Sequence, residues 1–207
     1  MADDPILYTN PRSRGRIVRW MLEEVGCPYT VEIVGYGPPM KSPEYLAINP
    51  MGKVPALVHG GQVITESGAI CAYLADAFPE AGLAPPAGER GAYYRWLFFA
   101  AGCVEPALIS KALGHVPPED RQGMVGYGTY ELTLNALEQA VSGRSFVAGD
   151  RFSAADVYVG AQIGWGMQFG TIEPNPAFEA YWAGLKARAA YQRATALDDA
   201  DMPPDAG

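Results

Sequence analysis

The segment from Asn49 to Leu74 contains residues whose types and spacing could bind a small anionic peptide. Val54-Pro55 stands where an apolar strand should begin, and proline fits a strand only at its start or edge because it lacks an amide donor. A cis bond before Pro55 would turn the amide and carbonyl of Val54 outward, where they could pair with an extended peptide. Glu66-Ser67 then opens a helix 11 residues after Pro55. The first amides of that helix and the Ser67 hydroxyl could bind a carboxylate, while Glu66 could hold an ammonium group.

The Glu66-Ser67 half of this pattern also has an ordinary structural explanation. A glutamate in a first helical turn complements the helix dipole, and Ser67 could simply be a helix cap. The combination of a candidate cis-proline with Glu-Ser at the next helix start is more specific than either part. We therefore interpret the segment as a ligand-binding surface.

A second candidate is the entrance to the first helix, Asn10-Pro-Arg-Ser-Arg-Gly-Arg16. Ser13 could be a helix N-cap whose hydroxyl accepts from an amide near Arg16. Alternatively, its hydroxyl could face a ligand thiol, whose reference pKa is about 8.5. A hydroxyl donor, the positive end of the helix and nearby arginines would all favour the thiolate. Arg12, Arg14 and Arg16 could equally be solvated charges or pair with carboxylates elsewhere.

Composition excludes several classes of function. The chain has 207 residues and a net charge of −8, which disfavours nonspecific binding to nucleic acid or to an anionic membrane. No apolar run of about 18 residues could span a membrane, and the N-terminus lacks the pattern of a signal peptide. The three widely spaced cysteines suit a reducing cytoplasm. Neither histidine has metal-ligand spacing with them, so we expect no metal site.

Apolar runs and turn residues predict the elements that position these candidates. We expect strands at about 6–8, 29–34, 56–59 and 63–65, and helices at 13–25, from Ser42 onward and at 66–77. This β-α-β-α-β-β-α order predicts a mixed four-stranded sheet that is parallel in its first half and ends in an antiparallel hairpin. The N-terminal α/β domain should therefore comprise residues 1–78.

A proline-rich segment separates this domain from a second one. Residues 79–88 are the expected linker, and 89–207 the expected all-α helical bundle. Glycine and proline stops divide it into helices at about 89–113, 118–141, 153–168, 176–189 and 191–197. We expect the acidic tail 198–207 to be frayed.

At these residues the sequence resembles the bacterial cytosolic glutathione S-transferases, of the serine type or outside the named classes, over nearly its whole length. The matching motifs are Asn49-Pro-Met-Gly-Lys-Val-Pro-Ala-Leu, Thr65-Glu-Ser-Gly-Ala-Ile and Gly149-Asp-Arg-Phe-Ser-Ala-Ala-Asp156. The resemblance implies a thioredoxin-like first domain, a helical second domain and a homodimer. In the third motif, Ser153 and Asp156 resemble a capping box and should serve folding rather than the site.

The resemblance also implies a role for each matching residue. Positions equivalent to Val54 pair with the main chain of the glutathione cysteine, and those equivalent to Pro55 are cis. Those matching Glu66 and Ser67 hold the γ-glutamyl end. A lysine near the position of Lys53 often lies beside the glycyl end.

The thiol-activating residue is a separate question, since members of the family use Tyr, Ser or Cys near the first helix and this chain has no Cys there. Ser13 is the predicted catalytic residue, with Asn10 and Arg12 as thiolate partners. Tyr8 is a second hydroxyl candidate, although it suits a packing role better.

The implied activity is conjugation of the glutathione thiolate to hydrophobic electrophiles, as in detoxification, with glutathione as co-substrate. The alternatives are glutathione-dependent disulfide reduction or isomerisation, which can dispense with a hydroxyl, and a noncatalytic binding module. The electrophile should enter an apolar cleft between the domains. Six aromatic residues are candidates for lining this cleft: Tyr36, Tyr93, Trp96, Phe99, Trp165 and Phe169. We expect one or two of them in the cleft and most of the others in the core of the helical bundle.

Overall fold

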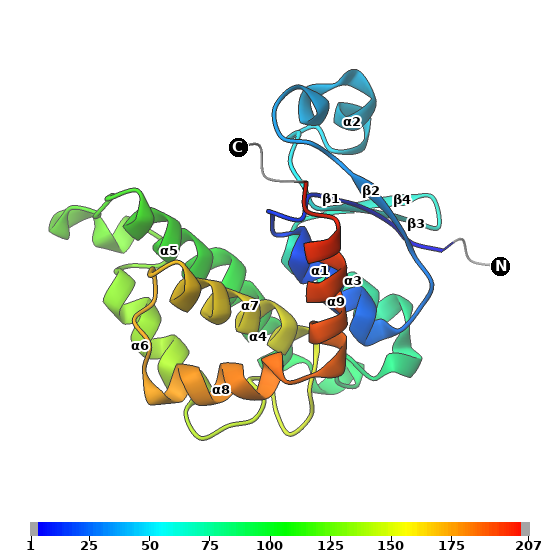
Figure 1. Cartoon of the computed structure of the whole chain (residues 1–207). Helices are drawn as coiled ribbons and strands as arrows, with labels where there is room; N and C mark the ends of the chain where they lie inside the picture. Colours follow the sequence, from blue (N-terminus) through cyan, green and yellow to red (C-terminus); the bar gives the residue numbers. More distant parts are fainter. Residues whose placement is uncertain (1–3, 204–207) are drawn as a thin grey trace. The chain divides into compact units, whose positions relative to one another are not determined.

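The computed structural model describes residues 4–203, which form two compact units (Figure 1). Within this range, residues 4–83 and 187–203 make the first unit, and residues 84–186 make the second. This division differs from the expected one at its C-terminal end, because the last helix packs with the N-terminal residues rather than with the helical bundle.

The first unit is built on a four-stranded sheet. Its strands are β1 (Ile6–Thr9), β2 (Thr30–Ile33), β3 (Ala56–His59) and β4 (Gln62–Thr65), in the order β2-β1-β3-β4. β1 and β2 are parallel, whereas β1–β3 and β3–β4 are antiparallel. The predicted mixed sheet and its terminal hairpin are confirmed. Gly60 and Gly61 both have positive φ, 56° and 74°, as a two-residue hairpin turn requires.

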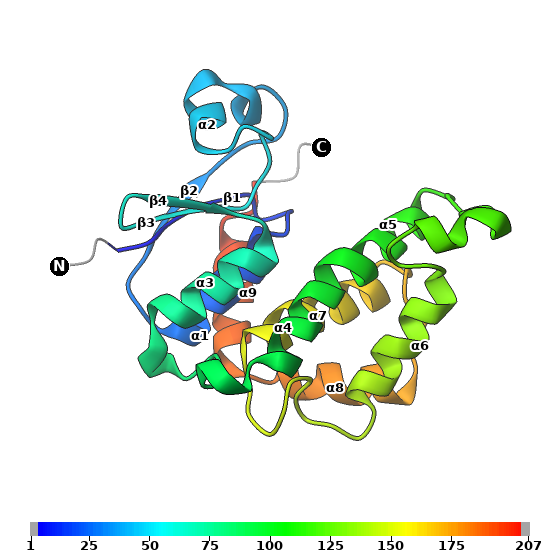
Figure 2. The same ribbon diagram turned by 180° about the vertical axis from the view of Figure 1, so that it is seen from behind.

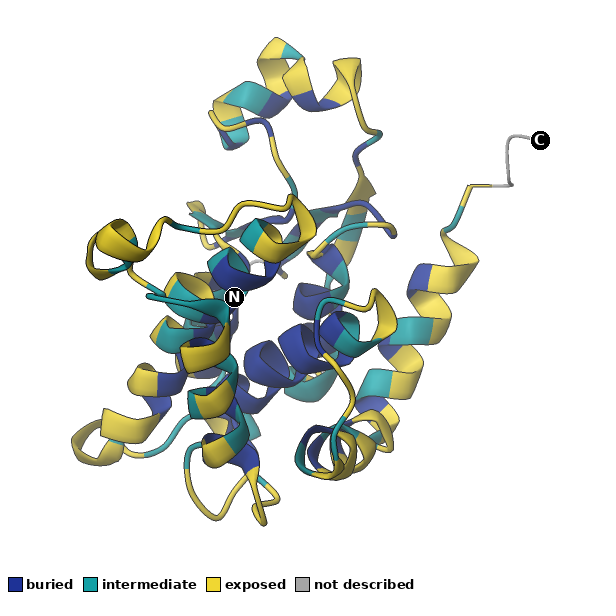
Figure 3. Ribbon diagram, turned by 90° about the vertical axis from the view of Figure 1, so that its left-hand side faces the viewer, coloured by how far each residue is buried: buried dark blue, intermediate teal, exposed yellow. Residues whose placement is uncertain are grey.

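Helices cover both faces of this sheet (Figures 1 and 2). α1 (Gly15–Val25) and α3 (Ser67–Ala77) pack together on one face. Gly26, with a φ of 75°, is the left-handed cap that follows the last residue of α1. The short α2 (Pro43–Ile48) lies on the other side, after a 3₁₀ turn at Pro38–Lys41. Most of the segment 35–51 is exposed or half-buried (Figure 3), with Tyr45 as one of its few buried side chains.

The C-terminal helix α9 (Ala189–Ala200) packs along α1 within the same unit. The rings of Trp20 and Tyr191 meet edge to face at 5.0 Å. Arg188 binds Glu24 through two hydrogen bonds of 2.6 and 2.7 Å. The expectation of a frayed tail from residue 198 is wrong for residues 198–200, because α9 continues to Ala200 and Asp198 is buried. Residues 204–207 of that expected tail lie outside the described residues.

The second unit is helical. α4 (Gly91–Phe99), a π-helical turn (Ala100–Val104) and α5 (Glu105–Ala112) follow one another without a break, and then come α6 (Tyr130–Val141), α7 (Ala154–Gln168) and α8 (Pro176–Lys186). α7 is buried along almost its whole length and begins with the predicted capping box of Ser153 and Asp156. The helix expected from residue 118 begins only at Tyr130, because Gly123, Gly126 and Gly128 interrupt the preceding segment. No helix within residues 4–203 is both long and apolar enough to cross a membrane.

Candidate functional site

Strand register brings the three sequence-predicted segments to one edge of the sheet in the first unit. Tyr8 of β1 is paired with Ala56 of β3, and Ala56 is paired with Thr65 of β4. Because both pairings are antiparallel, the residues after β1, before β3 and after β4 lie side by side. Asn10, Val54-Pro55 and Glu66-Ser67 therefore share this edge.

The Val54–Pro55 peptide bond is cis, as predicted. The preceding turn is held by the Lys53 carbonyl, which accepts from the Tyr45 hydroxyl at 2.6 Å and from Asn49 Nδ2 at 2.8 Å. Among the hydrogen bonds of residues 4–203, none uses the amide or the carbonyl of Val54. Its side chain packs against a small core of Val34, Met40 and Tyr45, so the residue is anchored while its backbone groups stay unpaired.

Glu66 and Ser67 form the start of α3. Ser67 is the first helical residue, so it is not the cap that the ordinary explanation required, and its side chain is mostly buried. Within the described part of the chain, its hydroxyl makes no hydrogen bond. Glu66 has φ 66° and ψ 116°, and is the one non-glycine residue with positive φ between residues 4 and 203. Such backbone conformations cost free energy and cluster at binding sites.

The loop between β1 and α1 is fixed by Asn10. Its Nδ2 donates to the Val34 carbonyl at 3.0 Å, and its Oδ1 accepts from the Arg12 amide at 3.0 Å. Asn10 is buried, and both ends of its carboxamide form hydrogen bonds, one within the loop and one to the residue that follows β2. The structure thus gives Asn10 an organising role at the site.

Ser13 is not the N-cap of α1, contrary to one of the two expectations. α1 begins at Gly15, and the capping position is occupied by Arg14, which makes no side-chain cap. The Ser13 hydroxyl accepts from the Gly15 amide at 3.0 Å and donates to the Asn10 carbonyl at 2.7 Å. To donate to a ligand sulfur, this hydroxyl would have to turn away from Asn10. Ser13 is half-buried, at the N-terminal end of an 11-residue helix.

Two side chains hold the same loop through contacts that the sequence did not predict. The hydroxyl of Tyr36 donates to the Arg12 carbonyl at 3.0 Å. Nε of Arg16 donates to the Pro11 carbonyl at 2.5 Å. The partners of Tyr36 are 24 positions away in sequence, so no local pattern could have identified this contact.

Lysines also lie at the turn before β3. Lys53, the predicted ligand for the glycyl end, has an exposed side chain. Lys41, which the sequence did not indicate, donates from Nζ to the carbonyls of Met51 and Gly52, both at 3.0 Å. A Cβ at Gly52 would lie 2.6 Å from the Met40 carbonyl, and its φ is 57°, so glycine is required there. Gly52 is therefore the residue in the sequence that could have indicated this close approach of the turn to the Met40 carbonyl.

Tyr8, the second hydroxyl candidate, packs against the core of Val34, Met40 and Tyr45. Its ring centroid lies 6.0 Å from that of Tyr45. Burial, followed by proximity to Tyr8, raises the pKa of Tyr45 to about 12, so the Tyr45 hydroxyl stays protonated and keeps its bond to Lys53. These contacts agree with a packing role for Tyr8.

The aromatic candidates for a second-substrate site differ in exposure. Tyr93 and Trp96 are buried in the helical unit, as expected of core residues, whereas Tyr36 and Phe169 are exposed. Phe99 and Trp165 are half-buried. In residues 4–203 no group of three or more His, Cys, Asp or Glu side chains is arranged to hold a metal ion.

Comparison with known proteins gives one consistent family. Residues 13–77 match the family described as glutathione S-transferase, N-terminal domain. The chain is 31% identical to the maleylacetoacetate isomerase of Pseudomonas aeruginosa, over 95% of this chain and 98% of that protein. A glutathione transferase structure from Methylococcus capsulatus is 30% identical, with a TM-score of 0.75 over 95% of this chain and 99% of its own.

A sphingomonad glutathione S-transferase, solved in complex with glutathione, is 28% identical and also has a TM-score of 0.75. It covers 94% of this chain and 98% of its own. The expected thioredoxin-like domain followed by a helical domain is confirmed by these likenesses. The chain belongs to the glutathione S-transferase family.

Proposed function

We propose that this glutathione transferase binds glutathione at the sheet edge formed by Val54-Pro55 and Glu66-Ser67, and conjugates its thiolate to hydrophobic electrophiles. The observation that carries the proposal is the pair of unused groups at that edge. The backbone of Val54 and the hydroxyl of Ser67 make no hydrogen bonds within residues 4–203, yet both residues are anchored. Polar groups held in place without partners are suited to a ligand that supplies them.

Glutathione has the chemistry to pair with these groups. The amide and carbonyl of Val54 would bond to the main chain of its cysteinyl residue, as an added strand does. The first amides of α3 and the Ser67 hydroxyl would bind the γ-glutamyl carboxylate, and the exposed Glu66 carboxylate would attract its ammonium group. Lys53 would lie near the glycyl carboxylate.

Ser13 is the proposed catalytic residue. Its hydroxyl would turn from the Asn10 carbonyl to the glutathione sulfur, donating a hydrogen bond to the thiolate while the thiol proton passes to solvent. Asn10 and Arg12 would support this step, Asn10 by fixing the loop and Arg12 by its positive charge. The thiolate then attacks the electrophile, a carbon–sulfur bond forms, and the displaced group leaves with its electron pair.

Calorimetric titration with glutathione tests the binding site. We expect Ser67→Ala to weaken binding by about tenfold, which corresponds to one lost hydrogen bond to a charged group. Ser142→Ala is the matched control, because the Ser142 hydroxyl donates to a helix carbonyl in the second unit. No saturable binding by the wild type would refute the proposal, and normal binding by Ser67→Ala would refute the placement of the γ-glutamyl end.

Turnover separates the possible reactions. We expect Ser13→Ala to lower conjugation of an aryl electrophile and to raise the pKa of the bound thiol. Turnover of a glutathione-capped disulfide that is unaffected by Ser13→Ala would instead favour disulfide reduction. The assay panel should contain electrophiles, peroxides and mixed disulfides.

A second candidate function, isomerisation, is favoured by one specific observation: the 31% identical relative is named a maleylacetoacetate isomerase. In such a reaction a thiolate could add to the substrate and leave again, so glutathione would be required but not consumed. Incubation with maleylacetoacetate distinguishes the two candidates, since conjugation depletes free thiol and isomerisation does not.

We further propose a cytoplasmic location, a homodimer and a role in detoxification. The acidic composition, with a net charge of −8, and membership of this family support these proposals. Size-exclusion chromatography with light scattering tests the homodimer, and a monomeric mass would refute it.

A further inference from the structure

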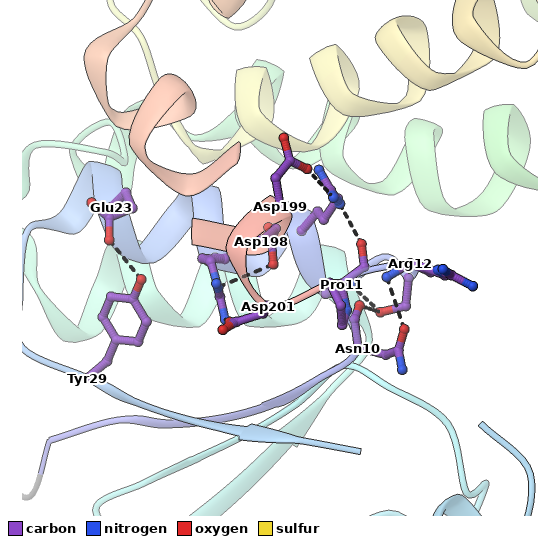
Figure 4. A network of polar contacts seen from close by, with 12 residues as sticks. Asn10, Pro11, Arg12, Glu23, Tyr29, Asp198, Asp199 and Asp201 are labelled. Carbon is purple, nitrogen blue, oxygen red and sulfur yellow. Dashed lines mark hydrogen bonds and ion pairs between the residues drawn. The ribbon is translucent and has the colours of Figure 1, made fainter. Parts of the chain in front are cut away.

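Arg16 connects the C-terminal helix α9 to the loop that carries Ser13. Its Nε donates to the Pro11 carbonyl at 2.5 Å, and its Nη2 donates to Oδ1 of Asp199 at 2.6 Å. The backbone amide of Arg16 also donates to the Ser13 carbonyl at 3.2 Å. Asp199, Pro11 and Asn10 lie together in this polar network (Figure 4). A single residue thus bonds to two carbonyls of the loop and to a helix 183 positions away.

The guanidinium group suits this arrangement because it is planar and presents donors in fixed directions. With Nη2 held by Asp199, the direction of the Nε bond to Pro11 is set as well. Pro11 lies between Asn10, whose carbonyl accepts from the Ser13 hydroxyl, and Ser13 itself. A shift of the Pro11 carbonyl would therefore displace both ends of that hydroxyl's hydrogen bond.

Stability is a poor explanation for the Arg16–Asp199 ion pair. The side chains are 26% and 61% exposed, and partly exposed pairs contribute little to the free energy of unfolding because water and salt screen them. A short, directional hydrogen bond between charged groups can favour one orientation of the guanidinium even where its contribution to unfolding is small. The pair is therefore better suited to fixing a geometry than to stabilising the unit.

We propose that Arg16 is a positioning residue for thiol activation, and that Asp199 of α9 fixes its orientation. This inference rests on the proposed function of Ser13. Reactions that depend on positioning lose up to about a hundredfold in rate when the reacting groups shift by about 1 Å. We expect Asp199→Asn and Arg16→Gln each to lower kcat/KM by about tenfold, mainly through kcat, and to move its pH dependence to higher pH.

The matched control is Arg193→Gln. Arg193 also joins α9 to α1, through an ion pair of 2.9 Å with Glu23, and its side chain is 55% exposed. In the described part of the chain, its hydrogen bonds and its ion pair go to Glu23 and not to the loop between β1 and α1. Its loss should leave kcat/KM and the pH dependence unchanged. Equal effects of Arg193→Gln and Asp199→Asn would overturn the proposal, because they would show that general loosening of α9 is sufficient.

A second measurement requires no glutathione and keeps this inference separate from the proposed function. Amide hydrogen exchange of residues 12–16 in the free enzyme should be faster in Asp199→Asn than in the wild type, and unchanged in Arg193→Gln. Unchanged exchange in Asp199→Asn would overturn the positioning role even if the enzyme conjugates glutathione. Faster exchange with no saturable glutathione binding by the wild type would support the positioning of the loop and refute the function proposed for it.

Arg16→Lys covers the case in which Arg16→Gln fails to fold. A lysine ammonium can reach Asp199 or the Pro11 carbonyl, but it lacks the planar fork that serves both in fixed directions. We expect Arg16→Lys to retain folding and to show the same upward shift of the pH dependence. A wild-type pH dependence in Arg16→Lys would overturn the proposal.

Discussion

Replacing Asp198 with asparagine should change how the stability of the first unit depends on pH. Asp198 is 1% exposed, and Nε of Arg19 lies 3.3 Å from its Oδ1. Neither carboxylate oxygen accepts a hydrogen bond from residues 4–203. Asp201 binds the other side of Arg19 at 2.6 Å. Burial is the largest influence and raises the pKa of Asp198 from 3.8 to about 6, opposed by Arg19 and Arg16 and assisted by Asp201 and Asp199.

The magnitude follows from this pKa. A rise from 3.8 to about 6 is about 2 units, and each unit corresponds to about 1.4 kcal/mol, so ionisation of Asp198 should lower the free energy of unfolding by about 3 kcal/mol. The folded state has the higher pKa and therefore holds the proton more tightly than the unfolded state. Its stabilising effect is complete below about pH 4 and is lost as the pH rises through about 6.

Asparagine cannot ionise, so the variant does not lose this part of the free energy of unfolding as the pH rises. The free energy of unfolding of Asp198→Asn minus that of the wild type should increase by about 3 kcal/mol between about pH 4 and pH 7. Urea titrations across this range, followed by both fluorescence and circular dichroism, measure the difference. Asp120→Asn is the control, because its side chain is 77% exposed and water screens its charge.

The opposite trend would refute the reasoning. If the variant loses stability relative to the wild type as the pH rises, attraction between ionised Asp198 and Arg19 outweighs the cost of burying the carboxylate. A flat difference would show that the two effects cancel at this site.

Three further substitutions have expected outcomes. Gly15→Ala should destabilise the protein by about 2 kcal/mol or more, because the new Cβ would lie 1.7 Å from Thr9 Oγ1, and a melting temperature equal to that of the wild type would contradict this. Asp156→Ala should cost about 4 kcal/mol in urea titrations, since it leaves several buried donors without their acceptor; a loss below about 1 kcal/mol would contradict the contacts. Tyr36→Phe removes the exposed hydrogen bond to the Arg12 carbonyl and should lower kcat/KM by a few-fold at most, without a measurable change in melting temperature; a larger thermal effect would contradict it.

Some features of the site are determined by residues at the same place in the sequence, and these could be predicted. Val54-Pro55 marked a strand start because proline cannot donate to a ladder, and the bond is cis. Glu66-Ser67 marked a helix start, and α3 begins at Ser67. The apolar runs and the Gly-Gly turn were sufficient to predict four strands with a parallel first pair and an antiparallel terminal hairpin. The position of β1 between β2 and β3 was not predicted, because it depends on contacts between segments distant in the sequence.

The contacts of the loop before α1 could not be predicted in this way. The local sequence is compatible with two arrangements of the Ser13 hydroxyl: it can cap the helix, or it can donate to the Asn10 carbonyl. Only the path of the loop decides between them. The Arg16–Asp199 pair joins positions 183 apart, and such a contact leaves no periodicity in either segment. The burial of Asp198 is missed for the same reason, because an acidic stretch near a chain end usually remains in water.

The division of the first unit between the two ends of the chain has a consequence for its biosynthesis. Residues 84–186 separate its N-terminal part from α9, so a ribosome must add the whole helical unit before α1 meets its last neighbour. At 5–20 residues per second this delay is on the order of ten seconds. During that time the nascent chain has α1 without Tyr191 beside Trp20 and without Asp198 and Asp201 beside Arg19. A nascent chain stalled before residue 187 should therefore be a target for chaperones that bind exposed apolar surface, and release of the completed chain should end that association.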